Sequence, residues 1–337
     1  MRKKLLLTSL ILVLVVSSLV GCSKPQTVTM VTDSGGVDDK SFNQSAWEGL
    51  EAFRDANKGK VEVNYIESSS EEDYQPNLTA AVDKGAGLTW AVGYMMAQQL
   101  QDTAKSNSKV SFGIIDWAPA EEDEVLDNVA YVTFKEHEGS FLVGLIAGLT
   151  TETNNVGFVG GMSGGVIEKF EVGFHAGVKA ANPDARVQIQ YAESWGDIPK
   201  GKQIATTMIR DGADVVYHAA GGTGIGVAEA CDEAQVHFIG VDVDQSDLTP
   251  YTLTSMLKRI DNAIQTISTE WLNGDFQGAK VYSLGLAEDG VGYGYDPDKI
   301  SDEVKAIVDD YAAKIKSGEL VIPTSNDELP AFLEGLK

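Results

Sequence analysis

The 337-residue sequence has two cysteines, four histidines and a single long apolar run. Cys22 and Cys231 cannot form a disulfide framework, and the four histidines are scattered and form no HExxH motif. Lysine and arginine total 26 against 50 acidic residues, a net charge of −24. Nucleic acid and anionic lipid surfaces are poor partners for such a chain because both would be repelled.

The apolar run belongs to a bacterial export signal at the N-terminus. Arg2–Lys4 form a basic head, Leu5–Val20 is mainly apolar, and Leu19–Cys22 matches the lipobox, whose cysteine receives a diacylglyceryl group before cleavage. A transmembrane anchor or an accidental cysteine is the alternative. We expect residues 1–21 to be a lipoprotein signal peptide and Cys22 to carry acyl chains such as palmitate. These chains would hold the protein on the cell membrane, facing outside the cytoplasm.

After the signal, short apolar runs alternate with amphipathic segments, and the pattern restarts near residue 155. Strands alternating with helices predict parallel sheets covered on both faces. The expected strands are 28–31, 61–66, 88–92, 110–115, 129–133, 155–160, 187–191, 215–219 and 238–241. The expected helices are 42–57, 74–84, 96–106, 138–149, 170–181, 201–211 and 225–234, and the late segments 261–273, 278–286 and 302–317 complete the sheets and lobes.

Two such runs predict an α/β fold of two doubly wound parallel-sheet lobes. The chain is expected to cross between them three times, near 134–138, 252–258 and 284–292. The N-terminal lobe is assigned residues 26–135 plus about 259–283. The C-terminal lobe is assigned 136–258 plus about 284–337.

Open parallel sheets bind ligands beyond the carboxyl ends of their strands. The loops that follow the predicted strands carry carboxylates and aromatic rings, and a lysine lies at the second crossing. Carboxylates accept hydrogen bonds from sugar hydroxyls and ring N–H groups, and aromatic rings stack on flat ligands. These residues are Asp33, Asp39, Phe42, Tyr94, Asp116, Trp117, Trp195, Asp242 and Lys258.

Each motif also has a structural interpretation. Residues 33–44 suit a solvated acidic turn with Ser41 capping the next helix, and the glycine-rich loop 219–226 suits tight strand–helix packing. That loop matches neither the dinucleotide nor the phosphate-loop pattern. His218 is expected to be a satisfied edge histidine, and Cys231 a buried structural thiol.

We find no catalytic triad, metal cluster or cofactor motif. Asp242 and Asp244 give only a fragment of a calcium loop, and no GxSxG surrounds Ser163. The sequence therefore predicts a binding protein that has no catalytic residues, no metal and no cofactor.

Six segments, in order along the chain, carry a family resemblance. They are Asp-Asp-Lys-Ser-Phe-Asn-Gln at 38–44, Val-Gly-Gly-Met at 159–162, Val-Ile-Glu-Lys-Phe-Glu at 166–171, Ala-Ala-Gly-Gly-Thr-Gly at 219–224, Gly-Val-Asp-Val-Asp-Gln at 240–245 and Thr-Ser-Met-Leu-Lys at 254–258. With these segments the chain resembles the basic membrane protein family of bacterial lipoproteins, the purine nucleoside receptor A-like solute-binding proteins. The resemblance implies a type I periplasmic-binding-protein fold and a monomer that delivers purine nucleosides to an ABC transporter permease.

The resemblance also implies roles for individual residues. Phe42 stacks on the base beside Asn43, and Asp116 recognises the base. Asp242 and Lys258 bind ribose hydroxyls, with Gly222 near the sugar. Trp195 replaces an expected Phe as the opposing stacker, and the loose stretch 163–165 widens the pocket. The full predicted ligand-binding set is Asp33, Asp39, Phe42, Asn43, Tyr94, Asp116, Met162, Val166, Trp195, Gly222, Asp242 and Lys258.

Other readings stay open at this point. The same fold could bind a sugar or another small polar ligand. A nucleoside-cleaving enzyme could use Asp33 and Asp39, and a surface sensor or adhesin is a third possibility.

Overall fold

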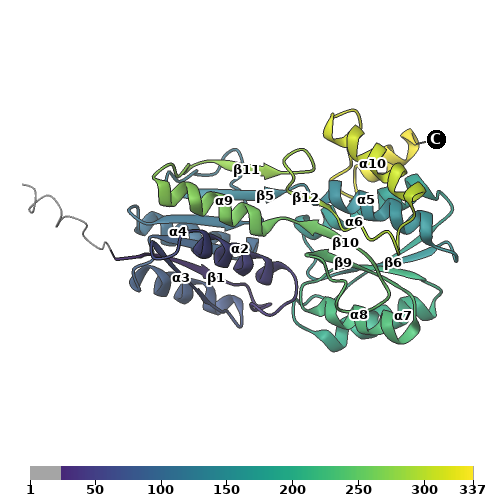
Figure 1. Ribbon diagram of the computed structural model, residues 1–337, viewed down its shortest axis with the longest axis horizontal. Coiled ribbons are helices and arrows are strands. Elements are labelled where there is room, and N and C mark those ends of the chain that lie inside the picture. The colour runs from purple at the N-terminus through teal and green to yellow at the C-terminus, as the bar shows by residue number, and fades with distance from the viewer. Residues whose placement is uncertain (1–23, 337) are drawn as a thin grey trace, which may run out of the picture.

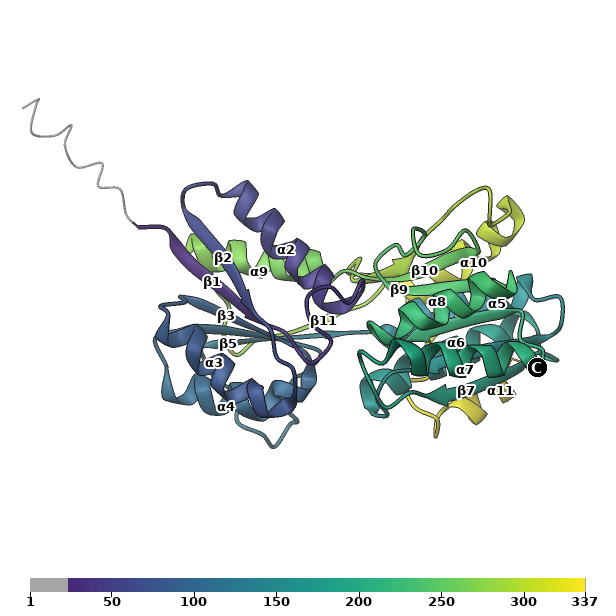
Figure 2. The same ribbon diagram turned by 90° about the horizontal axis from the view of Figure 1, so that it is seen from below.

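The computed structural model describes residues 24–336, which form two α/β lobes side by side (Figures 1 and 2). The first lobe is built around a six-stranded sheet in the order β11-β5-β4-β3-β1-β2, and all of its strand pairs are parallel. Its strands are β1 Gln26–Val31, β2 Val61–Ile66, β3 Leu88–Val92, β4 Ser111–Ile115, β5 Val129–Phe134 and β11 Val281–Leu284.

The second lobe repeats this arrangement, with the order β12-β10-β9-β8-β6-β7. Its strands are β6 Asn155–Gly160, β7 Arg186–Tyr191, β8 Val215–Ala219, β9 His237–Asp242, β10 Thr252–Lys258 and β12 Val291–Tyr293. All pairs are parallel except β10–β12, which is antiparallel. The alternating strands and helices therefore give the predicted α/β class, with two parallel-dominated sheets.

Helices cover both faces of each sheet, because the strands are apolar on both sides. In the first lobe, α2 (Phe42–Ala56) and α9 (Ile260–Asn273) pack together on one face, and α3 (Tyr74–Asp83) and α4 (Ala97–Ser106) on the other. In the second lobe, α7 (Ile198–Arg210) pairs with α8 (Thr223–Ala234), and α5 (Glu136–Thr150) with α6 (Gly165–Ala181). Helices α10 (Asp302–Lys316) and α11 (Leu329–Gly335) pack on α5 and α6 respectively.

Sequence periodicity explains why these segments pack as they do. Helix α2 buries Ala46, Leu50 and Phe53, which recur every three or four residues and so share one face. Strand β3 is buried along its whole length, as expected of a central strand with helices on both sides. Trp90 from this strand donates its indole N–H to Ser268 on α9, at 3.1 Å, and so ties the helix to the sheet.

Several boundaries differ from the sequence-based prediction. Helix α6 begins at Gly165, five residues before the predicted start, and α7 begins at Ile198, where the Asp197 side chain accepts a hydrogen bond from the Lys200 amide. Segment 252–258, predicted only as a crossing, is the strand β10. The short strand β12 and the terminal helix α11 were not predicted, because both are short and weakly patterned.

The chain passes between the two sheets three times. Strand β5 precedes β6 of the other sheet, β10 precedes β11, and β11 precedes β12. The exact residues that divide the lobes stay a prediction. Between residues 24 and 336, no helix combines the length and the apolar character that a membrane crossing needs. The predicted lipidation site Cys22 lies outside the described residues.

Candidate ligand-binding site between the lobes

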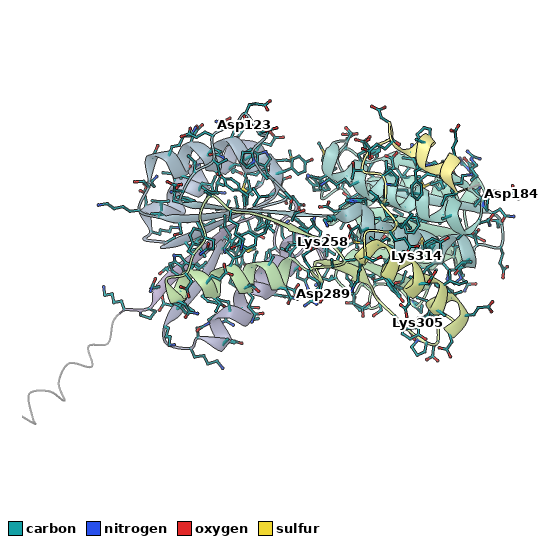
Figure 3. The ribbon with its side chains drawn as sticks, turned by 90° about the horizontal axis from the view of Figure 1, so that it is seen from above. Asp123, Asp184, Lys258, Asp289, Lys305 and Lys314 are labelled. Atoms are coloured by element: carbon teal, nitrogen blue, oxygen red, sulfur yellow. The ribbon has the colours of Figure 1, made fainter. Side chains whose placement is uncertain are left out.

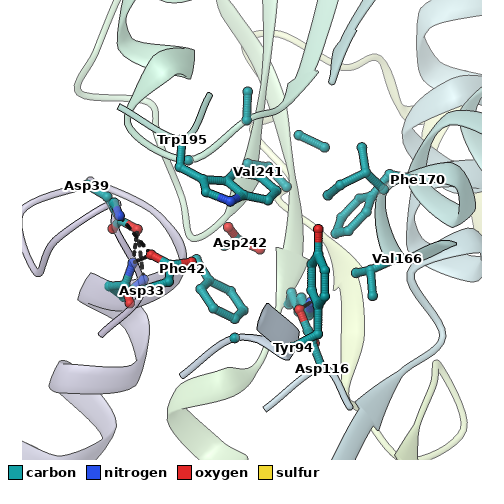
Figure 4. Close-up of a pocket in the computed structure, with 18 of the residues that line it drawn as sticks. Asp33, Asp39, Phe42, Tyr94, Asp116, Val166, Phe170, Trp195, Val241 and Asp242 are labelled. Carbon is teal, nitrogen blue, oxygen red and sulfur yellow. Dashed lines mark hydrogen bonds and ion pairs between the residues drawn. The ribbon is translucent and has the colours of Figure 1, made fainter. Parts of the chain in front are cut away.

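A cavity lies where the carboxyl ends of both sheets meet (Figure 4). It encloses about 550 Å³, including the part that is open to solvent. Its lining comes from both lobes: Asp33, Gly35, Asp39, Phe42, Asn43, Gly93, Tyr94, Met95, Asp116, Val166, Ile167, Phe170, Trp195, Ala219, Ala220, Gly221, Val241, Asp242 and Lys258.

Ten of the twelve residues predicted to bind ligand line this cavity. The other two, Met162 and Gly222, do not: Met162 is half-buried outside the lining, and the adjacent Gly221 takes the place predicted for Gly222. The main chain at Gly222 instead faces the Trp195 carbonyl and Asp39.

Sequence reasoning missed nine lining residues. Most are glycine, alanine or aliphatic, and they carry no chemical group that marks a site; they are Gly35, Gly93, Met95, Ile167, Phe170, Ala219, Ala220, Gly221 and Val241. Six of the nine lie in the segments that carry the family resemblance, and this position in a motif was the available signal: Ile167, Phe170, Ala219, Ala220, Gly221 and Val241.

Asp39 performs the capping role that was predicted for Ser41. Its carboxylate accepts the backbone N–H groups of Ser41 and Asn43, both at 2.9 Å, and of Gln44 at 3.1 Å. The Ser41 hydroxyl makes no cap and donates to the carboxylate of Asp242 in the other lobe. The prediction of a serine cap was wrong because a buried carboxylate across the cavity accepts the hydroxyl instead.

Asp33 and Asp39 lie near each other on the first-lobe side of the cavity (Figure 4), and Asn43 joins their carboxylates. Its amide Nδ2 donates to Asp33 at 2.8 Å and to Asp39 at 3.0 Å. Burial raises the pKa of both carboxyls to about 6, although hydrogen bonds from Asn43 and from nearby backbone amides oppose the rise. The side chains are thus fixed before any ligand arrives.

Asp116 and Asp242 occupy equivalent positions in the two lobes. Asp116 follows β4 and Asp242 ends β9, and both have left-handed backbones, with φ of 69° and 66°. This conformation is costly for a residue other than glycine and is concentrated at functional sites. Burial raises the pKa of each carboxyl to about 6, against the lowering effect of Lys258.

Lys258 lies between the lobes, in contrast to surface lysines such as Lys305 and Lys314 (Figure 3). Its ammonium is 2.6 Å from the Asp116 carboxylate and 3.1 Å from that of Glu136, and all three groups are buried. Burial lowers the pKa of Lys258, but the carboxylates of Asp116, Glu136 and Asp242 outweigh it, so the pKa lies above the ordinary value.

Three aromatic rings surround the same ammonium. Its distance to the ring centroids of Phe42, Phe134 and Phe170 is 5.2, 5.0 and 5.4 Å. Each ring attracts the cation through its quadrupole. Glu136 also accepts from Lys169 at 3.3 Å. Sequence reasoning did not single out Glu136, because nothing near the start of α5 marks it as buried.

Comparison with known proteins agrees with this architecture. The family model for ABC transporter substrate-binding protein PnrA-like proteins matches residues 26–326. The chain belongs to this family. A relative from Lactococcus lactis named "ABC transporter nucleoside-binding protein BmpA" is 35% identical, with 96% of this chain and 100% of that protein covered. The "CD4+ T-cell-stimulating antigen" of Listeria innocua is 46% identical, with 89% of each chain covered.

Solved structures show the same fold. An ABC transporter solute-binding protein from Aeropyrum pernix superposes with a TM-score of 0.82 at 28% identity, covering 93% of this chain and 97% of that one. Another, from Conexibacter woesei, gives a TM-score of 0.73 at 24% identity and covers 89% and 99%. This PnrA-like protein is therefore a substrate-binding protein of an ABC transporter.

In this PnrA-like protein, Phe42 and Trp195 project into the cavity from different lobes (Figure 4). The Trp195 ring packs over Gly161, where a Cβ atom would come within 2.3 Å of the ring. Its indole N–H points to the sulfur of Met95 in the first lobe, at 3.5 Å. Glycine at 161 is needed for the ring to lie in this position.

The sequence predicted structural roles, outside the ligand-binding set, for Cys231 and His218. Cys231 is fully buried on α8, and burial raises the pKa of its thiol, as suits a structural thiol. His218 is also fully buried, with Nε2 2.9 Å from Gln245 Oε1, while Nδ1 has no hydrogen-bond partner.

The proteins of this family bind substrates for transport and are not enzymes. Asp33 and Asp39, the carboxylates that a nucleoside-cleaving enzyme could use, accept hydrogen bonds from Gly35, Ser41, Asn43 and Gln44.

Proposed function

We propose that this substrate-binding protein is a lipid-anchored receptor that captures a purine nucleoside between its lobes and delivers it to an ABC importer. The observation that carries the proposal is the pairing of two aromatic rings, Phe42 and Trp195, from opposite sides of a cavity that also holds buried carboxylates and a buried lysine. A purine offers a flat face to the rings, and a ribose offers hydroxyls to the charges. The printed name of the Lactococcus lactis relative supports the same ligand class.

In the proposed complex, the base lies between Phe42 and Trp195. Asn43 and Asp116 meet its polar edge, and the ribose hydroxyls meet Asp242 and Lys258. Closure of the lobes over the ligand excludes water, which strengthens each of these polar contacts. The permease then recognises the closed form, since only in that form do both lobes take the relative position that they have around a bound ligand.

The proposed lipid anchor is attached to Cys22, and the lipobox sequence that ends at this residue is the basis for proposing it. Two acyl chains would keep the receptor beside its importer. We expect Cys22→Ser to move the protein from the membrane fraction to the soluble fraction after export. A variant that stays membrane-bound would contradict lipidation at this position.

Calorimetry with a panel of nucleosides, bases and sugars tests the ligand. We expect purine nucleosides to bind, and Phe42→Ala with Trp195→Ala to weaken binding at least about thirtyfold, because each base–aromatic stack is worth roughly 1–3 kcal/mol. Tyr65→Ala, at an exposed ring on β2, is the control and keeps wild-type affinity. Binding that survives loss of both rings would refute the stacking model.

The same assay separates the alternatives. If a sugar binds and nucleosides do not, the proposed ligand class is wrong, but the protein is still a receptor for a transported solute. Release of free base from inosine or adenosine with sustained turnover would instead favour the nucleoside-cleaving enzyme. We expect no turnover, because no bond of the ligand needs to break for transport.

A further inference from the structure

The two lobes are also joined by a contact that uses no residue of the cavity lining. The side-chain amide of Gln245, in the loop after β9, donates from Nε2 to the carbonyl oxygen of Lys40 in the first lobe, at 2.8 Å. Gln245 is only 2% exposed and is absent from the cavity lining. Lys40 has a left-handed backbone, with φ of 58°, and lies in the loop that carries Asp39 and Phe42.

The orientation of the Gln245 amide is fixed by its own lobe. Its Oε1 accepts the backbone N–H of Val241 at 3.0 Å and lies 2.9 Å from Nε2 of His218. An oxygen that accepts from Val241 must be the carbonyl end of the amide, so the NH₂ end faces Lys40. The backbone N–H of Gln245 donates to the Ser255 hydroxyl at 3.0 Å, which anchors the residue a second time.

The same bond sets the tautomer of His218. Since Gln245 Oε1 can only accept, His218 carries its proton on Nε2 and leaves Nδ1 bare, in agreement with the lack of a partner at Nδ1. The ring stacks on Phe238 at 5.3 Å, and a Cβ atom at Gly224 would come within 1.9 Å of it. Burial lowers the pKa of His218 to about 4, so the ring is neutral at physiological pH.

We propose that Gln245, held in place by His218, is a positioning residue that secures the Asp39–Phe42 loop against the second lobe when the cleft closes. The acceptor is a main-chain carbonyl, so the contact does not depend on which ligand lies in the cavity. Opening the cleft breaks the bond and leaves a prearranged donor without its partner. Gln245 therefore favours the closed form and slows ligand release without touching the ligand.

This inference rests on the proposed function for its ligand, and Gln245→Glu tests it. The substitution keeps the size of the side chain and replaces the donor by an oxygen that repels the Lys40 carbonyl. We expect every ligand of the wild type to bind about tenfold to a hundredfold more weakly, because the hydrogen bond between the lobes is replaced by repulsion between two oxygens. Dissociation becomes faster, association stays within about twofold, and the order of preference among ligands is unchanged.

Asp244→Asn is the matched control, because Asp244 is exposed one residue away, and it should bind as the wild type does. Gln245→Asn is a second variant: it keeps the amide but is one methylene too short to reach Lys40. Wild-type affinity in both Gln245 variants would overturn the inference. A changed order of preference would also overturn it, since that result would place Gln245 in contact with the ligand.

Thermal unfolding of the ligand-free variants separates positioning from a general structural role. We expect the unfolding midpoints to stay within a few degrees of the wild type while affinity falls. A parallel loss of stability and affinity would contradict the inference. If the wild type binds a sugar and no nucleoside, the proposed function fails, and the same Gln245 variants are tested with that sugar.

Discussion

The two walls of the cavity are built on different principles. The first-lobe wall combines Phe42, Tyr94 and Met95 with four polar residues, and hydrogen bonds hold its carboxylates in place; the polar residues are Asp33, Asp39, Asn43 and Asp116. The second-lobe wall is largely apolar, with Val166, Ile167, Phe170, Trp195, Ala219, Ala220 and Val241, and its charged groups are Asp242 and Lys258. Fixed polar groups orient a ligand, whereas apolar surface adds affinity without direction.

The difference assigns separate tasks to the lobes. The first-lobe wall is arranged without the ligand, so it can select the orientation in which a ligand enters. The second-lobe wall supplies contact area once the lobes close. Lys258 connects the two, because it extends from β10 of the second lobe to Asp116 of the first.

The largest expected effect comes from removing this connection. Lys258→Met leaves the buried carboxylates of Asp116 and Glu136 without their shared cation. We expect the free energy of unfolding to fall by about 3–5 kcal/mol and ligand binding to fall more than a hundredfold. Chemical denaturation and calorimetry measure the two effects. Lys169→Met, which also contacts Glu136 but is partly exposed, should cost far less; equal losses would show that the position of Lys258 between the walls is unimportant.

An intermediate effect is expected on the polar wall. The pKa of Asp33 is raised from 3.8 to about 6, so the folded chain holds this proton more tightly than the unfolded chain. The stabilisation is complete below about pH 4 and is lost as the pH rises through about 6, a change on the order of 3 kcal/mol. Asp33→Asn should therefore make the pH dependence of unfolding less steep and raise stability at pH 7, while Asp39, Asp116 and Asp242 keep their share of the pH dependence and ligand affinity falls about tenfold.

Denaturation at several pH values between 4 and 7.5 measures the Asp33→Asn prediction. Asp38→Asn is the control, because Asp38 is exposed in the same loop, and its profile should follow that of the wild type. An Asp33→Asn profile as steep as the wild-type profile would mean that another group causes the pH dependence.

The smallest effect is expected on the apolar wall. Val166→Thr keeps the shape of the side chain but places a hydroxyl against the ligand with no partner in the wall. We expect affinity to fall about threefold to tenfold, because an unpaired polar group costs roughly 1–3 kcal/mol when fully buried and Val166 is half-buried. Val187→Thr, at a half-buried valine on β7, should leave affinity unchanged. Tighter binding by Val166→Thr would show that this wall also recognises polar groups.

The fold could largely be predicted because the spacing of apolar residues within each short segment indicates whether it forms a helix or a strand. The failures have local causes too: β12 is three residues long, and Gly165 at the start of α6 is typical of a loop. Segment 252–258 has the composition of a strand, but its place between the lobes suggested a linker.

The site was predicted where the strand-end rule or a motif marked a residue. Glu136 was missed because its burial depends on Lys258 and Lys169, which are distant in sequence and meet it only in the folded chain. The Ser41 hydroxyl likewise bonds to Asp242 in the other lobe rather than to its own helix. Contacts between lobes are set by tertiary packing, and local patterns do not contain them.

The place of β11 in the first sheet has a consequence for biosynthesis. Residues 281–284 form the edge strand beside β5, although the second sheet lies between them in the sequence. A growing chain therefore cannot complete its first sheet until most of the second has been made. A truncation before Val281 would therefore leave both sheets without an edge strand, because β11 and β12 would be lost together.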